Sequence, residues 1–386
     1  MDIDAITSSA TVSRTQGGIY SETSVQAIKN EISQYLQINN MNFLLGAGCS
    51  SHIEENEEGL QVETGIPGMK QLFQGFCEEN EGFAIAGLQT NSAFDSNLEK
   101  MLEVMGSIQV VNDIHPIDSS ISKKISTVKH YLFRRIKDGQ GSPQVLDLYK
   151  SFYMRISSPN RKTPINVFTT NYDLFSEKAL DDLRFPYNNG FSGTYRRRFN
   201  PASYRYAFVE NLNLSNDVWE RVPHFFNLYK LHGSISWKKS GSEVFEVEPD
   251  TIAEDDTVMI YPTPMKDRST LMTPYSDIFR AMENVTSKPN SVLITIGYSF
   301  GDDHINRLIT NALAVPSFKL IVFGSGDNID KLNVLKDCRI IIINSADKIH
   351  YFKNIIENIL PPIAEETIED IETQEHANLA KELYRD

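Results

Sequence analysis

Cysteine is scarce in this chain, with only Cys49, Cys77 and Cys338 among 386 residues. An odd number of widely separated cysteines does not form a disulfide scaffold. No two of them have the two-to-four-residue spacing of a structural zinc site. The sequence therefore excludes a disulfide-stapled domain and a zinc ribbon, and we expect no metal site.

The chain also has fewer positive than negative charges, and it has no long apolar run. The 37 Lys and Arg against 51 Asp and Glu give a formal net charge of −14. Neutralising phosphates needs a cationic face, so we expect no direct binding of nucleic acid. No apolar run reaches the roughly 18 residues of a membrane span, and the first residues lack the basic and apolar regions of a secretory signal. We therefore expect a cytoplasmic protein with no membrane association.

Several stretches of the chain have no strand or helix period. The polar residues 1–22 are expected to be a mobile arm. A main domain over 23–360 is expected to carry a helical insertion at about 80–160 and an aromatic- and Arg-rich insertion at about 183–222. Residues 361–386 are expected to form an acidic helix.

Six short runs are apolar without alternation, which is typical of strands buried on both faces of a parallel sheet. They are 41–45, 164–170, 227–231, 291–296, 318–323 and 338–343. Further strands are predicted at 243–247 and 258–261. Helices are predicted at 23–38, 69–77, 97–108, 121–136, 144–156, from about 173, at 304–313 and at 364–384. This pattern predicts an α/β fold, a Rossmann-like doubly wound parallel sheet with a helical insertion subdomain.

Four of these strands end in small or polar residues, and ligands of open α/β sheets bind at the carboxyl ends of strands. The glycines of Gly46-Ala47-Gly48-Cys49-Ser50 would let the backbone turn sharply and approach a pyrophosphate, although a plain tight turn explains this motif equally well. In Thr169-Thr170-Asn171-Tyr172-Asp173, Asn171 is the expected ligand contact and Asp173 the expected cap of the next helix.

The other two strand ends carry a histidine and a serine. His232 follows a strand and precedes Gly233; a lone histidine is most often structural, but this position favours a functional role. Gly297-Tyr298-Ser299-Phe300-Gly301 could hold a ribose or phosphate, or could be an ordinary loop before a helix capped by Asp302 or Asp303.

In chain order, the pieces GAGCS, GIP, TTNYD, KLHGS and GYSFGDDHIN over roughly residues 40–310 resemble the sirtuin family, specifically its bacterial, zinc-free branch. The resemblance implies a domain that binds NAD, with Asn171 and His232 as the catalytic pair. It implies that Gly46, Ala47, Gly48 and Ser50 lie at the phosphates and that Ser299 and its neighbours lie near the adenosine half. The expected cofactor-binding set is Gly46, Ala47, Gly48, Ser50, Thr170, Asp173, Gly297, Ser299 and Phe300.

The sequence departs from sirtuin deacylases in three ways. It cannot build their four-cysteine zinc module, Gly68-Met69-Lys70 replaces the acidic-aromatic-arginine run after GIP, and an acidic segment at 54–63 follows GAGCS. The zinc-free branch resembles NAD glycohydrolases of bacterial antiphage systems. A short chain with a helical insertion most resembles the partner of a HerA-type hexameric ATPase, and we expect a homo-oligomer.

The resemblance therefore implies NAD hydrolysis to nicotinamide and ADP-ribose, a reaction that depletes NAD during abortive infection. His232 suits a general base and Asn171 suits orienting a water or ribose hydroxyls. Two alternatives stay open: an NAD-dependent protein deacylase, and a non-catalytic module that senses NAD or ADP-ribose. Cys49 is interpreted as a small apolar residue, and the arginines 196–198 as a salt-bridged surface or a subunit interface.

Overall fold

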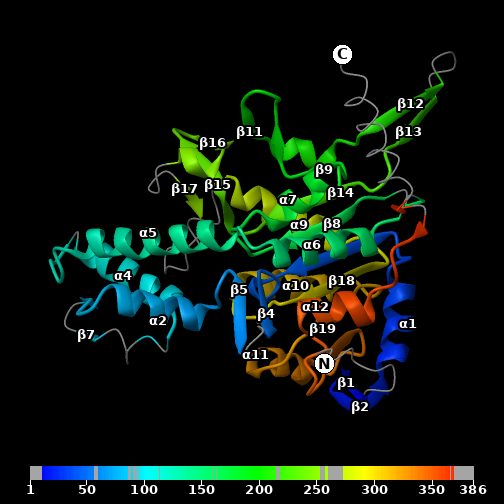
Figure 1. Ribbon diagram of the computed structural model, residues 1–386, viewed down its shortest axis with the longest axis horizontal. Coiled ribbons are helices and arrows are strands. Elements are labelled where there is room, and N and C mark those ends of the chain that lie inside the picture. Colours follow the sequence, from blue (N-terminus) through cyan, green and yellow to red (C-terminus); the bar gives the residue numbers. More distant parts are fainter. Residues whose placement is uncertain are drawn as a thin grey trace.

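A nine-stranded sheet forms the centre of the computed structural model (Figure 1), in the order β2-β1-β20-β19-β18-β3-β8-β14-β9. The structure describes residues 11–55, 60–85, 88–89, 94, 96–112, 114–158, 160–161, 163–213, 218–252, 257–259, 273–365 and 367–368. The strands of this sheet are β1 (Thr11–Gln16), β2 (Ile19–Ser24), β3 (Asn40–Leu45), β8 (Ile165–Thr169), β9 (Tyr187–Asn188), β14 (Phe226–Lys230), β18 (Ser291–Ile296), β19 (Lys319–Phe323) and β20 (Ile340–Asn344).

The six long central strands follow the doubly wound order. Counted along the chain as β3, β8, β14, β18, β19 and β20, they lie in the spatial order 3-2-1-4-5-6 and pair in parallel. The strand order therefore reverses between β3 and β18, and such a switch point is where ligands bind in open α/β sheets. The predicted Rossmann-like sheet is observed, with β1 and β2 added as an antiparallel edge.

Helices cover both faces of this sheet, which explains why its strands are apolar throughout. Phe43 and Leu45 point to one face, where they share a core with α1 (Val25–Tyr35), α6 (Pro143–Ile156), α7 (Phe175–Asp182), α12 (Phe352–Asn354) and the π-helix Ile355–Ile359. Leu44 points to the opposite face, covered by α9 (Tyr275–Thr286), α10 (Asp303–Ala312) and α11 (Asp327–Asp330). Alternate residues of one strand are thus buried in two different cores.

A five-stranded antiparallel sheet packs on the second of these faces through Trp237. Its order is β10 (Phe191–Ser192), β11 (Arg197–Phe199), β16 (Glu243–Glu246), β15 (Gly233–Ser240) and β17 (Thr257–Met259). Part of the predicted insertion at 183–222 supplies β10, β11 and the 3₁₀ helix Pro201–Arg205. The same stretch also forms a hairpin of β12 (Val209–Asn213) and β13 (Val218–Arg221), which extends away from the sheets (Figure 1).

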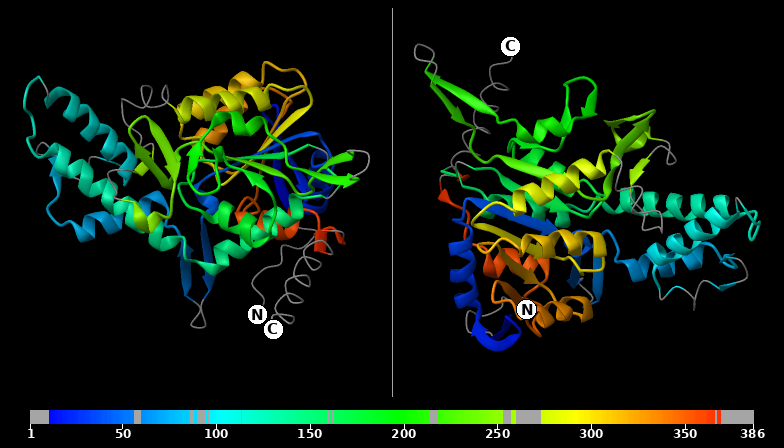
Figure 2. Two further views of the ribbon diagram at one scale, coloured as in Figure 1. Left: turned by 90° about the horizontal axis from the view of Figure 1, so that it is seen from above. Right: turned by 180° about the vertical axis from the view of Figure 1, so that it is seen from behind.

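Among the described residues, three helices form a lobe that extends from the end of the sheet (Figure 2). These are α2 (Met69–Glu79), α4 (Leu98–Asn112) and α5 (Ile121–Gly139), which share a core of their own around Phe76. The packing differs from the predicted limits of 80–160, because α2 lies in the lobe whereas α6 packs in the sheet core through Phe152 and Tyr153. Two short strands, β6 (Ala84–Ile85) and β7 (Leu88–Gln89), also occur where no strand was predicted.

The prediction of a mobile arm over 1–22 is wrong for residues 11–22. They form the hairpin of β1 and β2, and β1 pairs with β20, with Arg14 opposite Ile343. Arg14 also forms an ion pair with Glu31 of α1 at 3.0 Å. Few side chains of these two strands are buried, so their positions accept polar residues. Their sequence therefore lacks an apolar period. Residues 1–10 lie outside the described residues.

The acidic segments at 54–63 and 361–386 are only partly described. The first belongs to a hairpin of β4 (Ser51–Glu55) and β5 (Gln61–Gly65) that follows the GAGCS loop. The predicted C-terminal helix lies outside the described residues beyond residue 368. Within the described ranges, every helix is too short or too polar to cross a bilayer.

Candidate active site

Four parallel strands end at the same level of the main sheet. Ile296 of β18 lies opposite Leu45 of β3, Leu45 lies opposite Thr169 of β8, and Thr169 lies opposite Lys230 of β14. The four motifs that follow these residues are therefore brought together at one edge, around the switch point between β3 and β18. This edge is the candidate active site.

The two glycine loops at the switch point touch through their backbones. Gly46 N–H donates to Ile296 O at 2.9 Å, and Gly48 N–H donates to Gly297 O at 3.0 Å. A Cβ atom on Gly46 would lie 2.4 Å from Gly297 O, and one on Gly48 would lie 2.9 Å from Gly297 Cα. The glycines of GAGCS are thus required by the close approach of the second loop.

The amides of the GAGCS loop are largely used within the protein. The 3₁₀ helix Ala47–Cys49 closes when Cys49 N–H donates to Gly46 O and Ser50 N–H donates to Ala47 O, both at 3.0 Å. Ala47 and Gly48 are exposed, whereas Gly46 and Ser50 are buried. The expected phosphate contacts of this loop stay a prediction, and its exposed residues are the ones placed to make them.

Asn171 is buried and points toward the GAGCS loop. Its Nδ2 donates to Gly46 O at 2.9 Å and to Ser50 Oγ at 2.7 Å. A carbonyl can only accept, so the nitrogen must face Gly46 and the amide oxygen faces away from it. Ser50 Oγ in turn donates to Asp173 Oδ2 at 2.6 Å. Three predicted site residues therefore form one hydrogen-bonded chain, in which the Ser50 hydroxyl is spent on holding Asn171 and Asp173.

Two buried side chains that contact these hydrogen-bonded residues were not predicted as site residues. Tyr149 of α6 places its hydroxyl 3.4 Å from both Ser50 Oγ and Asn171 Nδ2, and burial raises its pKa well above the usual value. Its sequence signal is that of any core tyrosine on an amphipathic helix. Lys230 donates to the Asp173 carbonyl and pairs with buried Glu177 at 3.1 Å.

Asp173 lies at the start of α7, close to the role expected for it. Its Oδ1 accepts from Phe175 N–H at 3.1 Å, while Leu174 occupies the cap position itself. Cys49 agrees with its interpretation as a small apolar residue. Its Sγ is buried and donates to Ile296 O at 3.3 Å, and burial raises the pKa of the thiol.

His232 pairs with a carboxylate from a different loop. Its Nε2 lies 2.9 Å from Asp302 Oδ2, and the two side chains are only 12% and 10% exposed. Asp302 also caps α10 as predicted, since its Oδ1 accepts from His304 N–H at 2.9 Å and from Ile305 N–H at 3.3 Å. In the sheet, β3 and β8 lie between β14 and β18. The His232–Asp302 contact therefore joins the loops that follow β14 and β18, although two other strands separate β14 from β18 in the sheet.

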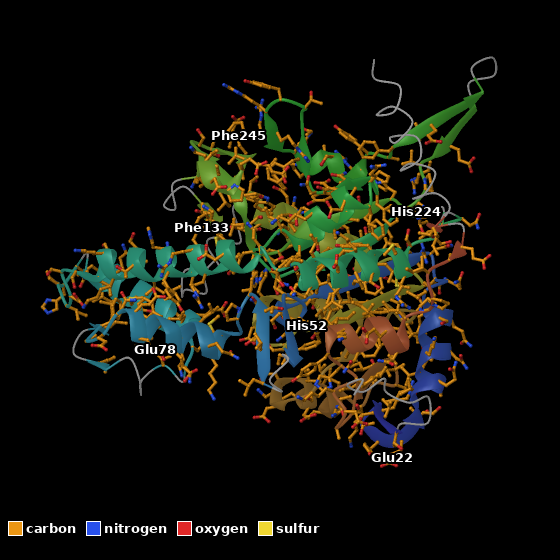
Figure 3. All side chains as sticks on the ribbon, in the orientation of Figure 1. Glu22, His52, Glu78, Phe133, His224 and Phe245 are labelled. Atoms are coloured by element: carbon orange, nitrogen blue, oxygen red, sulfur yellow. The ribbon has the colours of Figure 1, made fainter. Side chains whose placement is uncertain are left out.

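A second histidine, near the opposite end of β14, has a different environment. His224 precedes β14 at its amino end and is labelled in Figure 3. Its ring stacks on Phe185 at a centroid distance of 4.6 Å, and its Nδ1 shares a hydrogen bond with the Ser157 hydroxyl. His224 is thus a packed structural histidine, whereas His232 lies at the carboxyl edge with the other motifs.

The loop after β18 offers a serine and buries its aromatic residues. Ser299 is exposed, while the Phe300 side chain is 4% exposed and packs against Tyr298 at a ring distance of 4.9 Å. Phe300 has a φ of +55° and Gly297 one of +65°. A contact of Phe300 with a ligand would therefore have to come from its backbone. Thr170 is half-buried and donates its N–H to Leu45 O at 3.1 Å.

The arginine cluster lies on the small sheet, where Figure 3 labels Phe245 of β16. Arg197 Nε lies 3.0 Å from Glu246 Oε2, and Arg198 pairs with Glu243. These ion pairs support the interpretation of a salt-bridged surface. Among the described residues, no group of three or more His, Cys, Asp or Glu side chains is placed to hold a metal ion.

Comparison with family models finds a match for part of the chain. No curated protein matches the chain. Residues 165–343 match the family described as SIR2-like domain, a range that includes Asn171, His232 and the loop after β18. SIR2-like domains use NAD and are typically NAD-dependent enzyme domains. Together with the parallel-rich sheet, this match shows that residues 165–343 are similar to a SIR2-like domain of Rossmann type.

Proposed function

We propose that this chain is an NAD⁺ hydrolase that cleaves the bond between nicotinamide and ribose. The observation that carries the proposal is the position of Asn171 and His232, which follow two adjacent parallel strands at the same edge of a Rossmann-type sheet, within a range that matches a SIR2-like domain. Nucleotide cofactors bind at this edge in doubly wound folds.

The reaction needs few groups because nicotinamide is already an activated leaving group. The bond from ribose C1′ to the pyridinium nitrogen breaks. Its electron pair stays on that nitrogen, so nicotinamide leaves as a neutral molecule. A water oxygen then bonds to C1′ and gives up one proton, so that NAD⁺ and water yield nicotinamide, ADP-ribose and a proton. The protein has to orient the ribose, favour the developing cationic ribose and accept that proton.

His232 and Asn171 supply these functions in the proposal. The imidazole ring accepts the proton of the attacking water, since histidine is the side chain best suited to proton transfer near neutral pH. The Asn171 nitrogen is engaged by Gly46 O and Ser50 Oγ, so its amide oxygen is the atom that orients a water or a ribose hydroxyl.

The test is the loss of NAD⁺ and the appearance of nicotinamide and ADP-ribose with the purified full-length chain. Asn171→Ala and His232→Ala are expected to lower turnover by about 100-fold or more. Asn328→Ala and His115→Ala are controls of the same residue types on exposed positions, and they should leave turnover unchanged. Turnover preserved in either of the first two variants contradicts the assigned roles.

The same assay separates the two alternative functions. An acyl-lysine peptide that is deacylated in step with NAD⁺ consumption would favour a protein deacylase. Calorimetric binding of NAD⁺ without turnover, alone or with any partner, would favour a sensing module.

We further propose, on the resemblance of the sequence motifs alone, that the chain acts in antiphage defence by depleting NAD. In this proposal it forms a homo-oligomer and works with a HerA-type hexameric ATPase. Co-purification with such an ATPase and a fall of cellular NAD after phage infection would support it. Unchanged NAD levels in infected cells that carry both proteins would contradict it.

A further inference from the structure

Asp302 is held rigidly at the start of α10. One carboxylate oxygen accepts from the His304 and Ile305 amides, and Ile305 itself is fully buried in the core. The preceding loop is tied to the same helix, because Asn306 Nδ2 donates to Phe300 O at 2.9 Å and Tyr298 donates to Asn306 Oδ1 at 3.0 Å. The second carboxylate oxygen is thereby fixed in position to meet His232.

The contact between Asp302 and His232 dictates where the ring carries its hydrogen. An ionised carboxylate only accepts hydrogen bonds, and His232 Nε2 lies 2.9 Å from Asp302 Oδ2. The ring must therefore present a hydrogen on Nε2. In a neutral imidazole only one nitrogen is protonated, so Nδ1 is then the nitrogen with the free electron pair.

We propose that Asp302 is the positioning residue of this site, which holds His232 as the Nε2–H tautomer and makes Nδ1 the proton acceptor. The proposal rests on the proposed function for its chemical step. The attacking water gives its proton to Nδ1 as its oxygen bonds to ribose C1′. The imidazolium then carries hydrogens on both nitrogens, faces the Asp302 carboxylate, and returns the proton from Nδ1 to solvent.

The neighbouring carboxylate provides a matched control. Asp303 has the same charge one residue further along α10, is exposed, and has no hydrogen bond or ion pair to His232. Asp302→Asn keeps the size and the helix-capping ability of the side chain, because asparagine is as good an N-cap as aspartate. Its amide can donate as well as accept, so it no longer selects one tautomer of the ring.

Two measurements on the full-length chain test the proposal. Nitrogen-15 NMR of the histidine rings, assigned with His232→Gln, should show the Nε2–H tautomer in the wild type and a mixture in Asp302→Asn. The kcat for NAD⁺ should fall at least about 10-fold in Asp302→Asn with KM changed little, because the positioned base acts in the chemical step. Asp303→Asn should leave the tautomer and kcat unchanged.

An Nδ1–H tautomer in the wild type, or an unchanged kcat in folded Asp302→Asn, would overturn the proposal. If Asp302→Asn does not fold, Asp302→Ser keeps a helix cap but is too short to reach His232, and the same losses are expected. The NMR readout needs no turnover. A wild type that leaves NAD⁺ intact would therefore refute the hydrolase, while the tautomer alone would still decide whether Asp302 sets the ring.

Discussion

Asn171 is held by groups that come from three separate parts of the chain. Gly46 O and Ser50 Oγ follow β3, the Asp173 carboxylate that engages Ser50 follows β8, and Tyr149 lies on α6. Fixed hydrogen bonds of this kind hold a side chain in its working geometry before a substrate arrives. Ser50 is the central member, because its hydroxyl accepts from Asn171 and donates to Asp173.

Replacing Ser50 by alanine should therefore affect stability and activity together. The Asp173 carboxylate would lose a donor while it stays buried, at a cost of about 1–3 kcal/mol in the free energy of unfolding. NAD⁺ turnover should fall because Asn171 loses one of its anchors. Urea denaturation and the NAD⁺ assay measure the two effects.

Ser291→Ala is the matched control for this change. Ser291 is also buried and bonded to an asparagine, Asn42, at 2.8 Å, but it lies at the opposite end of β18. The Ser291→Ala variant should be less stable than the wild type and should keep its NAD⁺ turnover. Equal turnover in the Ser50 and Ser291 variants would show that Ser50 has no part in the site.

A largely buried carboxyl in the small sheet predicts how stability depends on pH. Burial raises the pKa of Glu246 from 4.5 to about 7, although Arg197 and the amide of Asn189 favour its ionised form. Between these two pH values the folded chain holds a proton that the unfolded chain has released. The free energy of unfolding should therefore decrease as pH rises from about 4.5 to 7, by on the order of 3 kcal/mol from this group.

Glu246→Gln should remove that part of the decrease, because glutamine does not ionise. Urea denaturation of both proteins at pH 5 and pH 8 checks this, and the variant should show the smaller difference between the two conditions. A difference of the same size in both proteins would mean that Glu246 ionises in the folded chain as it does in the unfolded one.

At the scale of the elements, the contact between two glycine loops fixes how β3 and β18 present the site. Gly46→Ala would place a Cβ atom 2.4 Å from Gly297 O and 2.6 Å from Tyr298 Cα, both of which are backbone atoms. The loops would have to separate, so we expect a loss of at least about 1–3 kcal/mol and of NAD⁺ turnover. Gly141→Ala is the control, since its Cβ would meet only Asp138 O at 3.5 Å. Wild-type melting of Gly46→Ala would contradict this account of the contact.

The strands buried on both faces could be predicted from the sequence, and the polar ones could not. Phe43, Leu44 and Leu45 face two cores in turn, which leaves an unbroken apolar run. β15 was missed because it begins in Gly233-Ser234 and ends in polar residues, so that only buried Ile235 and Trp237 mark it.

The four strand ends were predicted to form one site, and the strand register shows the edge that they share. The contacts within the site had no local signal. Asp302 and His232 lie 70 residues apart, and Tyr149 sits in a helix that was predicted to belong to an insertion. Only the fold brings these side chains together.

At the scale of the whole molecule, the chain has separate cores that should respond separately to a cavity. Phe76 is fully buried in the helical lobe against Phe83 and Tyr131, while Phe43 is fully buried beneath the sheet against Phe152. Truncation of either to alanine should cost about 3–5 kcal/mol locally. We expect Phe76→Ala to lose amide protection in α2, α4 and α5, and Phe43→Ala to lose it in the sheet.

Hydrogen exchange followed by mass spectrometry distinguishes these responses. Loss of protection throughout the chain in Phe76→Ala would show that the lobe and the sheet unfold as one cooperative unit. In that case the lobe could not move or open without the site.

The pairing of β1 with β20 has a consequence for how the protein is made. β1 leaves the ribosome long before β20, its second partner in the sheet, because more than about 300 residues separate the two strands in the chain. At about 5–20 residues per second, β1 and β2 wait for tens of seconds with an open edge. Their polar composition, which hides them in the sequence, suits that wait because an exposed polar hairpin has little tendency to aggregate during translation.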